Sequence, residues 1–229
     1  MPLRSTEDTP MTDTGTFVLD EIEPEIGTKI VVSRRQIFAK YRRLALVGSV
    51  PTLLAMAATE AFGQSGLPQQ VVDVLNYALS LEHFEATFYK MANATKDLIP
   101  SKYQGLFREI GEHEAGHVAL ISGVLGPAAV QAPKFDFTAG GKYPDVFSNF
   151  HTFSTLASTI EDTGVAAFKG QVGNLIGSSV LQTALQIHSI EARHAGSVRL
   201  LIGKTGSDGA FDKPMSKSEV LEAVKPFFV

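Results

Sequence analysis

Two segments of this sequence place a glutamate and a histidine three residues apart, the spacing that puts both side chains on one face of a helix. They are Glu114 with His117, and Glu191 with His194. In both segments, the positions three and four residues away are mostly apolar, which is the pattern of a helix face turned toward a core. Random placement of the glutamates and the 6 histidines would give fewer than one such pair. The two pairs therefore predict one shared site.

Two further glutamates complete a repeated pattern. Glu82 and Glu161 each lie in the middle of another apolar helical face, and each precedes one of the Glu–His pairs. Four buried carboxylates would repel one another strongly, whereas two divalent cations would cancel their charge and two neutral imidazoles would complete the ligand set. The chain has no cysteine, so the ligands are oxygen and nitrogen atoms, which suit iron or manganese and are also compatible with zinc.

Four helical patterns, each roughly 25 residues long, carry these side chains. They cover residues 68–95, 101–125, 149–175 and 178–202. Ser101 is the expected N-cap of the second, and about 22 residues rich in proline, glycine and aromatics separate the second from the third. We predict an all-α fold, a four-helix bundle at 64–203 with this long crossover. In the tail, 204–229, a capping box from Ser216 to Glu219 predicts a short final helix.

This arrangement resembles the ferritin-like superfamily of di-iron carboxylate bundles. The stretches LNYALSLEHFEATFY and GEHEAGHVALISGVLG further resemble the ferritin-like domain proteins often described as desiccation-related. The resemblance implies a centre for two divalent metal ions, with iron expected first and manganese next, in which Glu114 and Glu191 bridge the ions. The metal ligands that it implies are Glu82, Glu114, His117, Glu161, Glu191 and His194.

Residues near this set have roles that the pattern leaves open. Tyr89 lies two turns after Glu82, where ferritins and rubrerythrins keep a tyrosine beside the metals, so a redox or supporting role and a core role are both open. Glu85, one turn after Glu82, is the alternative ligand, and the spacing to Tyr89 favours Glu82. His188 is expected beside the ligands or in solvent rather than among the ligands.

We expect Asp162 to accept a hydrogen bond from a ligand histidine, as carboxylates often do at metal sites. Glu112, His113 and His83 lie off the apolar faces and are predicted to be at the surface. Gly164 stands where rubrerythrins carry a further glutamate, and the cysteines of a rubredoxin module are missing. The sequence therefore disfavours a rubrerythrin-type peroxidase, and the leader and crossover disfavour a cage-forming ferritin.

The N-terminal part has a different character. Residues 1–32 are acidic and are predicted to be a disordered leader, and 33–63 resemble a twin-arginine export signal, with Ser33-Arg34-Arg35 ahead of an apolar run. We therefore expect the twin-arginine translocation machinery as a partner, a periplasmic or otherwise exported product, and no stable membrane anchor after cleavage. An uncleaved anchor is the alternative, because the run approaches the roughly 20 residues that span a bilayer. Met11 is an alternative start.

The net charge of −4 and the lack of a basic patch with aromatic residues exclude nucleic acid as an expected partner. The leading hypothesis is an exported di-metal protein that handles iron, O2 or peroxide as a ferroxidase, an oxidase or a peroxide scavenger. The alternative is a non-enzymatic envelope stress or desiccation-related protein whose metal site is structural. A third hypothesis is a protein that partners an oxidoreductase, and a homodimer is compatible with each of them.

Overall fold

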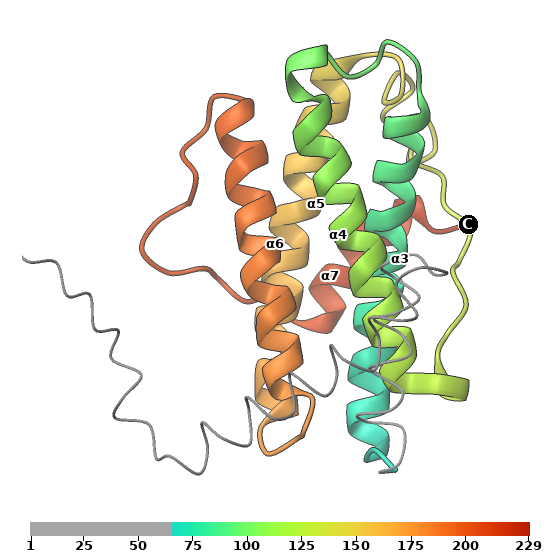
Figure 1. The fold of residues 1–229 in the computed structure, drawn as a ribbon, viewed down its shortest axis with the longest axis vertical. Helices are drawn as coiled ribbons and strands as arrows, with labels where there is room; N and C mark the ends of the chain where they lie inside the picture. Colours follow the sequence, from blue (N-terminus) through green and yellow to red (C-terminus); the bar gives the residue numbers. More distant parts are fainter. Residues whose placement is uncertain (1–65) are drawn as a thin grey trace, which may run out of the picture. The chain divides into compact units, whose positions relative to one another are not determined.

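The computed structural model describes residues 66–229, so the predicted leader and export signal lie outside the described residues. The fold is the predicted all-α bundle, and Figure 1 shows its long helices side by side. The helices are α3 (Gln69–Ala94), α4 (Ser101–Leu125), α5 (Phe150–Gln171), α6 (Leu181–Leu201) and α7 (Lys217–Val224), with short 3-10 turns η1 (Gly126–Ala128), η2 (Val172–Leu175) and η3 (Lys225–Phe227). Within 66–229, no helix is both long and apolar enough to cross a membrane.

The helix ends agree with the prediction except at three places. Ser101 is not the N-cap of α4: Pro100 holds that position, and Ser101 is the first helical residue without a capping side-chain bond. The regular part of α5 stops at Gln171 and continues as η2. Helix α6 begins at Leu181, because Gly177 adopts a φ of +79° and turns the chain before it.

The helices form two pairs, α3 with α4 and α5 with α6, and α3 also packs on α5. Residues 126–149 form the predicted long crossover, which runs along the bundle beside α3 from the end of α4 to the start of α5 (Figure 1). The C-terminal residues pair with this crossover, where the amide of Asp136 donates to the carbonyl of Phe227 at 2.8 Å. The crossover packs on the bundle in its second half, where Phe137 and Val146 are buried in the aromatic cluster.

Two apolar clusters fill the bundle at different levels along its axis. One is rich in aromatic rings, including Phe88, Phe107 and Phe153, and the other is mainly aliphatic, including Leu75 and Ile187. On each long helix, the residues of the two clusters stand on either side of the predicted ligand glutamate. The buried carboxylates thus form one polar layer between two apolar ones.

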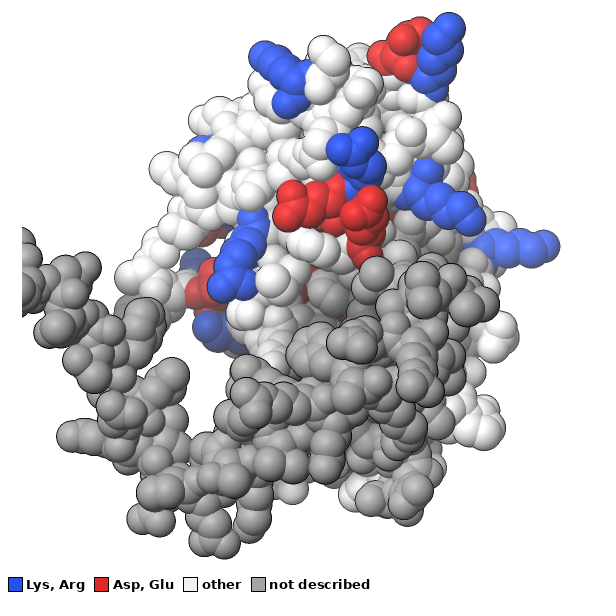
Figure 2. Space-filling view, in the orientation of Figure 1, with Lys and Arg blue, Asp and Glu red and all other residues white. Residues whose placement is uncertain are grey.

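The short helix α7 closes one side of the bundle. Its predicted capping box is confirmed, because Ser216 Oγ accepts from the amide of Glu219 and the Glu219 carboxylate accepts from the amide of Ser216. A Cβ atom at Gly170 would lie 1.9 Å from the carbonyl oxygen of Met215, so only glycine permits this approach of the tail to α5. On the face drawn in Figure 2, basic and acidic side chains are interspersed rather than gathered by sign.

Candidate metal centre

The polar layer brings together all six of the side chains that the sequence predicts as ligands. Helix α3 contributes Glu82, α4 the first Glu–His pair, α5 Glu161 and α6 the second pair. Each carboxylate residue is 0% exposed, and the two histidines are 9% and 5% exposed. The four helices thus enclose a shared group of donor atoms: Glu82, Glu114, His117, Glu161, Glu191 and His194.

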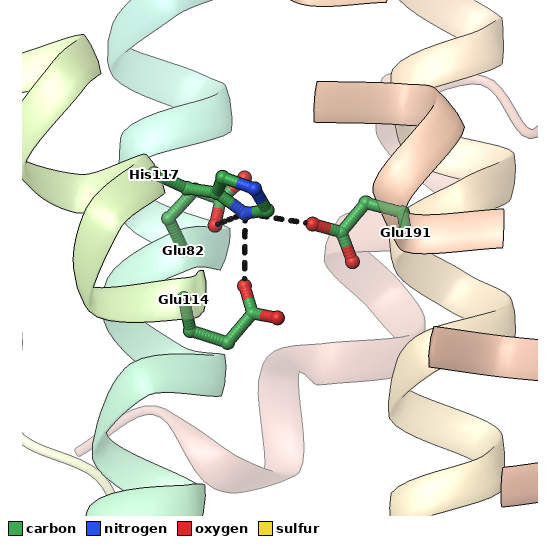
Figure 3. Close-up of side chains that lie close together, drawn as sticks. All are labelled: Glu82, Glu114, His117 and Glu191. Atoms are coloured by element: carbon green, nitrogen blue, oxygen red, sulfur yellow. Dashed lines mark hydrogen bonds and ion pairs between the residues drawn. The ribbon is translucent and has the colours of Figure 1, made fainter. Parts of the chain in front are cut away.

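One half of the group is centred on His117 (Figure 3). Its Nδ1 atom lies 2.9 Å from Oε1 of Glu191 and 3.2 Å from Oε2 of both Glu82 and Glu114. Three helices supply these residues, and one donor atom from each lies within 4.8 Å of the others. The arrangement can hold one metal ion.

The other half is centred on His194. Its Nδ1 atom lies 2.8 Å from Oε1 of Glu114, 3.6 Å from Oε2 of Glu161 and 3.7 Å from Oε2 of Glu191. Glu114 and Glu191 belong to both halves, and each turns one oxygen to His117 and the other to His194. A carboxylate that offers one oxygen to each of two neighbouring positions has the geometry of a bridging ligand.

The donor chemistry of the cluster fits two divalent cations. Each Nδ1 atom faces three carboxylate oxygens, but a ring nitrogen has one proton or one lone pair and can serve only one of them. Both oxygens of Glu82 and of Glu191, and Oε2 of Glu161, are buried without a hydrogen-bond partner among the described residues. Such groups are costly to bury, and a cation placed between nitrogen and oxygens would bind all of them at once.

Burial and mutual contact shift the protonation of the cluster. Burial acts to lower the pKa of both histidines, but the surrounding carboxylates outweigh this effect. They hold the pKa of His117 well above its usual value and raise the pKa of His194 to about 10. Burial also acts to raise the pKa of Glu114, yet hydrogen bonds from the two histidines lower it to about 2. For Glu82 and Glu161, burial dominates and raises the pKa. The imidazoles therefore hold protons that a metal ion at Nδ1 would displace.

Tyr89 touches the cluster directly. Its hydroxyl donates a hydrogen bond to Oε1 of Glu161, and its side chain is fully buried. Burial, followed by the nearby Glu161 charge, raises the pKa of Tyr89, so the hydroxyl stays protonated as a donor. A Cβ atom at Gly111 would lie 3.0 Å from Nδ2 of Asn93 and 3.2 Å from Cβ of Tyr89, so the glycine on α4 permits the close approach of α3 beside Tyr89. Tyr89 thus supports the position of Glu161.

Two predictions about the surrounding residues are wrong. Asp162 does not accept from a ligand histidine, because its Oδ1 accepts from Nε of Arg199 at 2.6 Å. Arg199 in turn donates to both carboxylate oxygens of Asp208 at 2.5 Å, which ties the loop after α6 to α5. His113 is not a free surface residue: its Nδ1 lies 3.0 Å from Nε2 of His194, and the two rings stack. No periodicity signals this contact, because His113 lies beside the apolar face of α4.

Glu85 and Glu82 have different places in the structure. Glu82 belongs to a donor group and Glu85 does not, although Glu85 is only 2% exposed and its Oε2 has no hydrogen-bond partner among the described residues. A Cβ atom at Gly164 would lie 2.7 Å from Oε1 of Glu85, so its carboxyl fills the space that this glycine leaves. His188 is half-buried and outside both donor groups.

Comparison with known proteins identifies two similarities. A family model described as ferritin-like domain matches residues 70–204, a range that includes all six predicted ligands and more than half of the chain. Among curated proteins, Protein rds1 of Schizosaccharomyces pombe is 26% identical over 157 residues. That match covers 69% of this chain and 35% of the yeast protein, so the chain spans about a third of the length of this relative.

Proposed function

Since this chain belongs to the ferritin-like domain family, we propose that it binds two iron or manganese ions and handles iron, O2 or peroxide through them. The observation that carries the proposal is the pair of shared carboxylates, because Glu114 and Glu191 each turn their two oxygens to different histidines. A single-ion site needs no such sharing. Two adjacent redox-active ions when bound supply the electrons for reduction of O2 or peroxide.

The chain's own residues divide the work of the centre. Glu82 and His117 would hold one ion, Glu161 and His194 would hold the other, and Glu114 and Glu191 belong to both donor groups. If Nδ1 of His194 were a ligand, its Nε2–H group would donate a hydrogen bond to Nδ1 of His113, which would fix the ring orientation. The apolar clusters above and below the layer exclude bulk water from the carboxylates.

Metal analysis and a reaction with oxidant test this proposal. The protein produced with iron and manganese is expected to hold close to two ions per chain by elemental analysis. Mixing its Fe(II) form with O2 or peroxide is expected to give transient absorbance and turnover. A content well below one ion per chain would contradict the proposed centre, and full loading without any reaction would contradict the redox role alone.

A structural role is the second candidate, and the placement of the ligands favours it. The donor atoms come from all four long helices, so bound ions would cross-link the whole bundle. In that case, metal raises the melting temperature strongly, while the Fe(II) form shows neither transient absorbance nor turnover with oxidant. The same two measurements therefore separate a redox protein from an envelope stress or desiccation-related protein with a structural metal site.

We also propose that residues 33–63 direct export through the twin-arginine route to the periplasm. The support is the sequence, with Arg34 and Arg35 ahead of a moderately apolar run. This route carries folded proteins, so the centre would receive its metal before export. Fusion of residues 1–64 to a reporter tests it: export is expected for the natural sequence and is expected to stop when both arginines are changed to lysine. Equal export of the two fusions would overturn the assignment.

A further inference from the structure

A groove between α3 and α4 leads to the metal centre. It has a volume of about 1030 Å³ and is bounded by residues of both helices and by Ile190 of α6. Much of its wall consists of residues with small side chains, which leave the space open: Ala86, Ala94, Gly111, Ala115 and Gly116. We call this space the α3–α4 groove. Its volume is in the range of sites that hold organic molecules, and far more than O2 or a metal ion needs.

The α3–α4 groove borders both halves of the centre. His117 lines it, with a side chain that is 11% exposed, while Nδ1 of the same ring faces three ligand carboxylates. His113 also lines it and contacts His194 of the other half. A molecule in the groove can therefore lie against the imidazoles that belong to the metal centre or support it.

The charged residues of the groove favour an anion. Lys90 and Arg108 line it, both are exposed, and neither forms an ion pair within the described part of the chain. Glu112 is the acidic residue in the same wall, so the local balance is positive. A path for Fe²⁺ would be expected to carry carboxylates, since divalent cations are drawn to them and repelled by lysine and arginine. The groove is thus poorly suited to iron entry.

The positive charges and the metal centre are separated along the groove. Arg108 precedes His117 by nine residues on α4, which corresponds to about 13 Å at 1.5 Å per residue. Gly111, Ala115 and Gly116 line the groove on α4 between these two positions, and Leu120 lines it one turn beyond His117. A cationic end, a wall of small uncharged side chains and then a metal-ligating histidine suit a molecule with an anionic head and an apolar body.

We propose that the α3–α4 groove binds a small organic anion, its carboxylate or phosphate at Lys90 and Arg108 and its apolar body directed toward His117. The inference rests on the proposed function and names the substrate class of the same centre. The two cations provide recognition of the head group, and the alanine and glycine wall buries the body. A substrate held this way presents the end opposite the anion to the metal ions.

Calorimetric titration of the full chain after metal removal tests binding independently of the centre. Octanoate and octyl phosphate are the probes, and octanamide is the neutral comparison. We expect at least one anion to bind roughly tenfold more tightly than the amide, with an affinity that falls as salt is raised. The tighter anion identifies the head group. If neither anion binds better than the amide, the proposal is overturned.

Paired variants locate the binding. Lys90→Gln with Arg108→Gln is expected to remove the advantage of the anion, about tenfold in affinity. Lys134→Gln with Lys204→Gln changes two exposed lysines that do not line the groove and is expected to leave the affinity unchanged. Equal loss in both double variants would mean a non-specific charge effect and would overturn the proposal.

Loading the full chain with Mn²⁺ tests the orientation. Proton relaxation of bound octanoate is expected to increase most at the terminal methyl group, because the methyl group points to the centre. The greatest increase at the protons next to the carboxylate would mean that the anion ligates the metal, which overturns the proposed orientation. Failure to bind Mn²⁺ would contradict the proposed function alone, since the titration after metal removal does not depend on the centre.

Discussion

At the scale of single residues, Glu114 contacts both histidines of the cluster, whereas a ligand to a single ion would contact only one. Its two oxygens lie 3.2 Å from Nδ1 of His117 and 2.8 Å from Nδ1 of His194. We expect Glu114→Gln to weaken metal binding at both positions. The loss in affinity should reach at least about tenfold to hundredfold, the range for residues that support metal ligands. Competition titration with a chelator measures this. Glu109→Gln, an exposed change on the same helix, is the control, and equal affinities in the two variants would contradict the bridging role.

Tyr89 and Glu161 form a buried pair whose strength can be measured without metal. Tyr89→Phe keeps the ring and removes the donor, so Oε1 of Glu161 is left without its partner. We expect a loss of about 1 to 3 kcal/mol in the free energy of unfolding of the chelated protein. Tyr103→Phe is the matched control, because the Tyr103 ring stacks on Phe150 and its hydroxyl makes no hydrogen bond with the described residues. Denaturant unfolding should show a clearly smaller loss for the control.

Sequence could predict features set within one helix, and it could not predict contacts between helices. The six predicted ligands follow helical periodicity, because each must point from one helix into the same layer. The contact of His113 with His194 joins residues on two different helices, as does the pair of Asp162 with Arg199. Such contacts depend on helix rotation and packing distance, which periodicity does not specify. The polar layer was thus predictable, with Tyr89 as a candidate beside it, and the contacts of His113 and Asp162 were not.

At the scale of helices, the lengths and the long crossover followed from apolar periodicity and from the proline-rich and glycine-rich connection. The end of α5 could not be predicted from this periodicity, because its last turn changes to the 3-10 form of η2. The close approach of Met215 to Gly170 also had no local signal, since it joins the tail to α5 through backbone atoms. The one sequence feature associated with such a contact is the glycine itself, which does not identify the segment that approaches it.

The carboxyl group of Glu85 on α3 occupies the space beside Gly164 on α5. A methyl group there would lie 2.7 Å from Oε1 of Glu85, so we expect Gly164→Ala to destabilise the protein by about 1 to 3 kcal/mol. In a Glu85→Ala background the cost should be smaller, which a double-mutant cycle of unfolding free energies measures. Gly105→Ala on α4 meets no atom within 4 Å and should instead stabilise by up to about 1 kcal/mol. Equal costs of Gly164→Ala in the two backgrounds would rule out the contact.

At the scale of the whole molecule, the cluster couples stability to pH. The pKa of His194 is raised to about 10, so its contribution is fully present below about 6.5 and is lost as pH rises toward 10. Burial raises the pKa of Glu82 and Glu161, so the folded protein keeps protons that the unfolded chain releases above about 4.5. The lowered pKa of Glu114 acts oppositely, but only as pH falls from about 4.5 toward 2.

Bound metal should oppose the loss of stability that the metal-free protein shows as pH rises. The chelated protein is expected to melt at a lower temperature at pH 8.5 than at pH 6, because the buried imidazoles and carboxylates lose protons that stabilise the folded state. Metal ions compete with these same protons, so affinity and the rise in melting temperature on metal addition should be larger at pH 8.5 than at pH 6. Thermal melts at both pH values, with chelator and with Mn²⁺, measure the two trends. Calorimetry in two buffers with different ionisation enthalpies and no phosphate, PIPES and Tris, then detects the released protons, and a binding enthalpy that is independent of the buffer would contradict proton displacement from His117 and His194.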